Sequence, residues 1–76
     1  MSIEYYFTHE SSDVIIYNVV YDGMKFKVTI IKSSTNISSM YLVESNNILY
    51  TVTDKKLKQK LTKLVLEYHT LRKICE

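Results

Sequence analysis

The chain has 76 residues, a formal net charge of +2 at pH 7, one cysteine, one glycine and no proline or tryptophan. This length allows a single domain, residues 1–76, and excludes a second core. Because there is only one cysteine, no internal disulfide can form. The sequence has neither a secretion signal nor an apolar run long enough to span a membrane, so we expect a cytoplasmic protein.

The first strand is predicted at residues 3–8. Ile3, Tyr5 and Phe7 alternate there with Glu4, Tyr6 and Thr8, the period of a strand with one buried face. The loop that follows, HESSD at residues 9–13, places His9, Ser11, Ser12 and Asp13 side by side. A catalytic triad needs converging side chains held by a rigid scaffold, which neighbours on one short loop do not provide. We interpret this segment as a polar turn.

A β-hairpin is predicted at VIIYNVVYDGMKFKVTII, residues 14–31, with its turn at Asp22-Gly23. Asp-Gly between β-branched and aromatic runs is a strong hairpin signal, because both turn residues take positive φ. A two-residue loop sets the register. It pairs Tyr21 with Met24, Val19 with Phe26, Tyr17 with Val28, and Ile15 with Ile30, all on one apolar face.

The opposite face of this hairpin is only half polar. It holds Val14, Ile16, Asn18, Val20, Lys25, Lys27, Thr29 and Ile31. A sheet face turned fully to water alternates more cleanly than this. The face is therefore either partly covered within the monomer or in contact with a partner.

A second hairpin is predicted after a loop at residues 33–39, in MYLVESNNILYTVT, with its turn at Asn46-Asn47. Asparagine tolerates the positive φ that such a turn needs. This register puts Tyr41 and Val43 on one face with Ile48, Tyr50 and Val52. Met40, Leu42 and Leu49 lie on the other face with Glu44, Thr51 and Thr53.

A C-terminal helix is predicted from Asp54, in DKKLKQKLTKLVLEYHTLRK and onward, with Thr53 or Asp54 as its N-cap. An apolar stripe at spacings of 4 and 3 runs along it, formed by Leu57, Leu61, Leu64, Tyr68, Leu71 and Cys75. This stripe packs either on the sheet or against the helix of a second copy. Leu66 lies opposite the stripe, so we expect it to be exposed if the sheet covers the stripe.

The first turns of this helix are rich in lysine, at the end where the helix dipole disfavours positive charge. Lys56, Lys60 and Lys63 line one flank of the stripe, and Lys58 and Arg72 the other. Residues 54–76 have seven basic and three acidic side chains, so the positive charge is concentrated in the helix. Either the lysine stems lie along the helix–sheet junction with their ammonium groups in water, or the lysines bind phosphate or an acidic partner.

No catalytic, cofactor or metal site is predicted. His69 and Cys75 point to different sides of the helix, and no pair of residues has metal-ligand spacing. We interpret His69 as a partly exposed helix residue. The only glycine, Gly23, is used by the hairpin, so no phosphate-binding loop is available. The chain is expected not to be an enzyme and to need no cofactor.

The predicted fold is α+β: an antiparallel meander of about five strands, followed by one C-terminal helix packed on one sheet face. For function, we first expect a small interaction protein that binds and occludes a host protein. The half-apolar sheet face and the 7 tyrosines favour an interface. Abundant Ile, Asn, Lys and Tyr indicate AT-rich codons, which, with the small size, suits a phage- or virus-encoded inhibitor of the anti-defence type.

The alternative is a homodimeric protein that binds single-stranded nucleic acid. The order of elements over roughly residues 14–76 resembles that of the PC4-type single-strand-binding coactivator domain. That resemblance implies a dimer formed through the helix and nucleic acid bound on the sheet. Lys25 and Lys27 alternate on the outer sheet face with tyrosines nearby, as stacking platforms require. Either function gains from a homodimer, and the candidate contact residues are Lys25, Lys27, Lys56, Lys60, Lys63 and Leu66.

Overall fold

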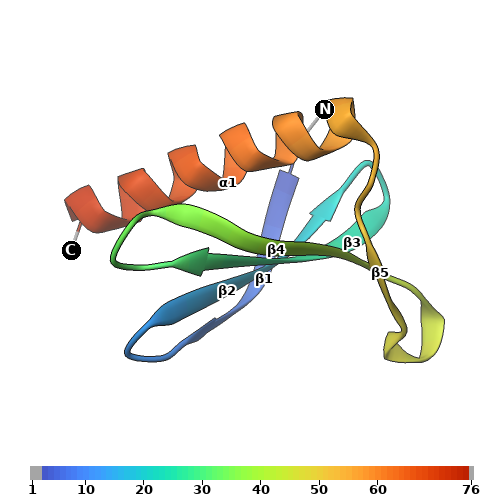
Figure 1. Cartoon of the computed structure of the whole chain (residues 1–76), viewed down its shortest axis with the longest axis horizontal. Helices are drawn as coiled ribbons and strands as arrows, with labels where there is room; N and C mark the ends of the chain where they lie inside the picture. The colour runs from blue at the N-terminus through green and yellow to red at the C-terminus, as the bar shows by residue number, and fades with distance from the viewer. Residues whose placement is uncertain (1–2, 76) are drawn as a thin grey trace.

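The computed structural model describes residues 3–75, apart from the side chains of Phe7 and Cys75. Its elements are, in order, β1 (Ile3–Glu10), β2 (Val14–Tyr21), β3 (Met24–Ile31), β4 (Asn36–Val43), a short helical turn η1 (Ser45–Asn47), β5 (Leu49–Thr51) and α1 (Lys55–Cys75). The strands form one antiparallel sheet in the order β1-β2-β3-β4-β5, and α1 crosses one of its faces (Figure 1). The predicted α+β fold is confirmed.

The central hairpin, β2–β3, has the predicted register. Asp22 and Gly23 have φ values of 54° and 76°, and the four predicted pairs, from Tyr21–Met24 to Ile15–Ile30, are all present. This turn geometry matches the right-handed twist of the two strands. Of the side chains on that face, all but Met24 are buried, so the hairpin supplies most of the core.

Strand β1 is longer than predicted and contains a bulge at Tyr6. Tyr5 pairs with Val19, and the next paired residue, Phe7, is opposite Asn18. A bulge shifts the alternation of faces by one residue. As a result Glu10, opposite Ile15, lies on the side of the sheet that faces α1. The predicted place of the Phe7 side chain lies outside the described part of the chain.

The predicted loops are too long. Strand β1 continues through His9 and Glu10, and β4 already begins at Asn36. What remains of HESSD is a tight turn in which the Val14 amide donates to Ser11 Oγ at 3.3 Å. The interpretation as a polar turn is therefore confirmed for residues 11–13 and wrong for His9 and Glu10, which belong to β1.

The predicted register of the second hairpin is wrong by one residue. Leu42 pairs with Tyr50 and Val43 with Leu49, and the Glu44 amide donates to the Ile48 carbonyl at 2.8 Å. Asn46 and Asn47 both have positive φ, as expected, but the loop has three residues because Ser45 belongs to it. A shift of one residue exchanges the two faces. Met40 and Val52 are therefore buried in the core, and Tyr41 and Val43 lie on the outer side.

Helix α1 begins as predicted. Asp54 Oδ1 accepts a hydrogen bond from the Leu57 amide at 3.2 Å, and the Asp54 carbonyl accepts one from the Lys58 amide at 2.9 Å. A carboxylate at this position satisfies a free amide of the first turn and suits the positive end of the dipole. Asp54 is thus the N-cap.

The buried line of α1 differs from the predicted stripe. Leu61, Val65 and His69, each four residues apart, are buried, while Leu71 is 60% exposed. The helix is therefore rotated by roughly a quarter turn from the predicted orientation. Leu57, Leu64 and Tyr68 pack only against the margin of the core. The predicted position of the Cys75 side chain in the stripe lies outside the described part of the chain.

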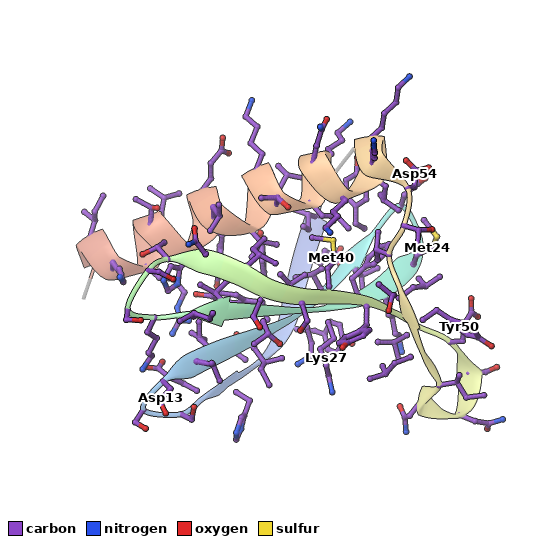
Figure 2. All side chains as sticks on the ribbon, viewed as in Figure 1. Asp13, Met24, Lys27, Met40, Tyr50 and Asp54 are labelled. Carbon is purple, nitrogen blue, oxygen red and sulfur yellow. The ribbon has the colours of Figure 1, made fainter. Side chains whose placement is uncertain are left out.

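The core lies between the sheet and α1. Met40 points from β4 into this layer, whereas Lys27 points to the opposite side of the sheet (Figure 2). Tyr5 of β1 closes one margin: its ring stacks on that of Tyr68 with centroids 3.7 Å apart, and its hydroxyl donates to the Leu64 carbonyl at 3.1 Å. Within residues 3–75, no helix is both long enough and apolar enough to cross a membrane.

Candidate protein-binding face of the sheet

The side of the sheet turned away from α1, here called the outer face, is built by the alternation of β2, β3, β4 and β5. Adjacent strands place their outward residues in rows. One row runs Val20, Lys25, Val43 and Leu49, and the next runs Asn18, Lys27, Tyr41 and Thr51. Ile16 and Thr29 continue the face toward Val14 and Ile31. Among the described residues, no helix or further strand lies over this face (Figure 1).

The outer face is more apolar than a face that only meets water. Val14, Ile16, Val20, Ile31, Tyr41 and Val43 are all half-buried there, screened by their neighbours and not by another layer. The sequence left open whether this face is covered within the monomer. In the structure, α1 packs on the other side of the sheet. The outer face therefore keeps a contiguous apolar surface, which is typical of an interaction site.

Lys25 and Lys27 are both on the outer face, as predicted. Lys25 is exposed, and its Nζ lies 6.0 Å from the centroid of the Tyr6 ring. Lys27 is half-buried between its register partners Asn18 and Tyr41. Two ammonium groups set among apolar and aromatic side chains favour a partner that is apolar and contributes acidic groups.

One end of the outer face is hollowed. A cavity of about 550 Å³ lies there, lined by Tyr6, Met24, Lys25, Val43, Glu44 and the loop at residues 45–47 among others. Next to this loop Leu49, opposite Val43, extends the outer face and is 43% exposed. Tyr50 is 52% exposed, but it is opposite Leu42 and therefore lies on the side of the sheet that carries α1. Sequence reasoning missed the place of Leu49, because the predicted register of the second hairpin put it on the other face from Val43.

The lysines of α1 do not join this surface. Lys56, Lys60 and Lys63 are exposed on the helix, on the other side of the sheet from Lys25 and Lys27. The Nζ of Lys60 lies 5.9 Å from the ring centroid of Tyr21, a core residue. This contact favours the interpretation that a lysine stem covers the helix–sheet junction while its charge stays in water.

Leu66 is not the exposed residue that was expected. It is half-buried and packs against the core, because the rotation of α1 brings it to the margin of the sheet. The exposed apolar residues of the helix are instead Leu71 and Ile74, at 60% and 75%. Leu66 is therefore a poor candidate for partner contact.

His69 was also misplaced by the sequence interpretation. It is only 4% exposed, and its Nδ1 lies 2.7 Å from the hydroxyl of Tyr17. These residues are 52 positions apart, so no local pattern connects them. The usable signal was Tyr17 itself: a tyrosine predicted to face the core needs a polar partner for its hydroxyl.

No family model, curated protein or solved structure that was compared with the chain matches it. In the described part of the chain, no group of three or more His, Cys, Asp or Glu residues is placed to hold a metal ion.

Proposed function

We propose that the protein acts by binding, without catalysis, and that its outer face docks on another protein and occludes that protein's surface. The observation that supports this most is the position of the contiguous apolar residues: Ile16, Val20, Tyr41 and Val43 lie on the face that α1 does not cover. Leu49, which is opposite Val43 and 43% exposed, extends the same surface. The sequence is rich in residues that have AT-rich codons, which suits a phage- or virus-encoded protein. We therefore propose a host protein as the partner.

The partner should be an apolar surface bearing at least one carboxylate. Lys27 is half-buried at the centre of the outer face, so a docked protein would desolvate its ammonium group. A desolvated charge is tolerated only when it is paired and hydrogen-bonded. An acidic side chain placed opposite Lys27 would meet that need and would exclude partners that lack one.

The experiment compares three baits in an extract of the cells in which the protein occurs. Val20→Arg puts a bulky charge in the middle of the outer face, and Gln59→Arg introduces the same side chain at an exposed position on α1. A partner of the outer face is retained by the unsubstituted protein and by the Gln59→Arg variant, and is lost with Val20→Arg. Equal retention by all three baits, or by none, contradicts the proposal.

Single-stranded nucleic acid is the second candidate for the same face. It is favoured by one arrangement: Lys27 lies beside Tyr41 in register, and Lys25 lies over Tyr6. Aromatic rings next to ammonium groups can stack bases and contact phosphates. Anisotropy of a labelled single strand, measured at two salt concentrations, tests it. Binding that weakens with salt and disappears in a Lys25→Glu, Lys27→Glu variant would favour nucleic acid over protein.

A homodimer remains part of the proposal, and the fold restricts where it can form. Leu61, at the centre of the predicted helix seam, is fully buried against the sheet. A helix–helix dimer through that seam would have to open the core. A second copy would therefore occupy the outer face, in competition with the partner. Light scattering tests this version, since Val20→Arg should convert such a dimer to a 9.0 kDa monomer.

A further inference from the structure

A pocket of about 300 Å³ lies on the side of the sheet that carries α1, near the C-terminal end of the helix. Its lining includes the buried residues Ile15, Tyr17 and His69, and the charged residues Glu10, Lys32, Arg72 and Lys73. These come from the end of β1, from β2, from the turn directly after β3 and from the last turns of α1. The pocket is separate from the outer face.

The inner part of the pocket is a polar network placed where an apolar core would be expected. The Tyr17 hydroxyl is 2.7 Å from His69 Nδ1 and accepts a hydrogen bond from Arg72 Nη1 at 3.1 Å. Tyr17 is 0% and His69 4% exposed. A leucine at position 69 would simply extend the line of Leu61 and Val65. Buried polar groups cost stability unless they are fully satisfied, so their use at the edge of a cavity indicates a role beyond packing.

The charged residues of the pocket bring a positive field to this network. Lys32, Arg72 and Lys73 stand against one carboxylate, Glu10, which forms an ion pair with Lys32. The helix dipole explains why basic residues suit the last turn of α1. It does not explain Lys32, which directly follows β3 and lines the same cavity. The pocket therefore collects cations from two separate elements.

We propose that this pocket binds the phosphate group of a small phosphate monoester. Three cations against one carboxylate leave a net charge that matches a phosphate dianion, and a guanidinium such as that of Arg72 can contact two phosphate oxygens at once. The Arg72 guanidinium carbon lies 5.6 Å from the Tyr17 ring centroid, within cation–π range, and the hydrogen bond of Arg72 to the Tyr17 hydroxyl pre-orders the side chain. The volume leaves room beside the phosphate for a small organic group against Ile15.

Backbone amide NMR titrations test the site with adenosine monophosphate, inorganic phosphate and adenosine as probes, each at matched ionic strength. Adenosine monophosphate should cause saturable shifts at Lys32, His69 and Arg72, and adenosine should not. Arg72→Gln should weaken binding about tenfold or more, because a charge-assisted contact is lost. Inorganic phosphate binding as tightly as the monoester supports the site and assigns it to free phosphate.

Two further variants keep the test decisive. Lys73→Gln removes an exposed charge of the pocket without touching the buried network, so it should weaken binding and leave the fold intact. Lys63→Gln removes an exposed lysine elsewhere on α1 and should have no effect. The absence of saturable shifts, an equal response to adenosine, or equal weakening by Lys63→Gln and Lys73→Gln would overturn the proposal.

Discussion

The hydroxyl of Tyr17 and Nδ1 of His69 lie 2.7 Å apart inside the core and join strand β2 to helix α1. Arg72 donates to the same hydroxyl at 3.1 Å. We predict that Tyr17→Phe lowers the free energy of unfolding by about 1–3 kcal/mol, because it removes the partner of buried polar groups. Urea denaturation measures the change.

A double-mutant cycle separates this hydrogen bond from packing. His69→Leu alone should also destabilise the fold, since it leaves the Tyr17 hydroxyl without its imidazole contact. The double variant Tyr17→Phe, His69→Leu should lose less than the sum of the single variants, because both single changes break the same bond. Strict additivity would mean that the contact contributes nothing to stability.

Alkaline pH should destabilise the protein through Tyr5. Burial, followed by the neighbouring Tyr68 and Tyr17 rings, raises the pKa of Tyr5 from 10.0 to about 12. Between these two values the unfolded chain loses the proton and the folded chain keeps it, so the free energy of unfolding falls as pH rises. Below pH 10.0 this contribution is constant.

Tyrosinate absorbance and circular dichroism, followed together against pH, measure this effect. Tyr5→Phe should reduce the alkaline loss of stability. Tyr50→Phe, at a position 52% exposed on β5, is the control and should leave that loss unchanged. An unaltered alkaline profile in Tyr5→Phe would exclude Tyr5 as its source.

The orientation of α1 can be tested with two leucines of the same helix. Leu61 is 0% exposed and Leu71 is 60% exposed. Leu61→Ala should cost about 2–5 kcal/mol, as expected for a cavity in a packed core. Leu71→Ala should change stability by less than about 0.5 kcal/mol, as at most surface positions. Equal losses would support the predicted stripe and contradict the rotated helix.

The N-cap of α1 should contribute measurably to the free energy of unfolding. Asp54→Ala removes the acceptor of the Leu57 amide and should cost about 1 kcal/mol. Asp54→Asn keeps an acceptor and loses only the charge that suits the dipole, so its cost should be smaller. Thermal unfolding of the two variants ranks them. If Asp54→Asn lowers the stability as much as Asp54→Ala does, the hydrogen bond is not the stabilising contact.

The predictable parts of the fold are those in which a local rule allows one answer. Asp22-Gly23 strongly favours a two-residue loop, so the register of β2–β3 followed from the sequence. Asn46-Asn47 accepts positive φ in loops of two or three residues, and the choice of three reversed the faces of the second hairpin. The bulge at Tyr6 has no glycine or other local signal.

The site was only partly predictable for a related reason. Lys25 and Lys27 were placed correctly because they belong to the hairpin whose register is unambiguous. The orientation of α1 was predicted wrongly because Leu71 was assigned to the core and His69 was not. A histidine becomes a core residue only through a distant partner such as Tyr17. The place of Leu49 beside Val43 on the outer face depended on the hairpin register that failed.

Methyl NMR can distinguish the two faces of the same strands. The spectrum of the free protein is compared with that of the protein bound to a partner retained by the bait experiment. Val20 and Val43 lie on the outer face, while Val19 and Val28 alternate with them in the core. Binding to the outer face predicts large shifts or broadening of the Val20 and Val43 methyl signals, with Val19 and Val28 little changed. Shifts confined to the exposed helix residues Leu71 and Ile74, with Val20 and Val43 unaffected, would contradict the proposed function.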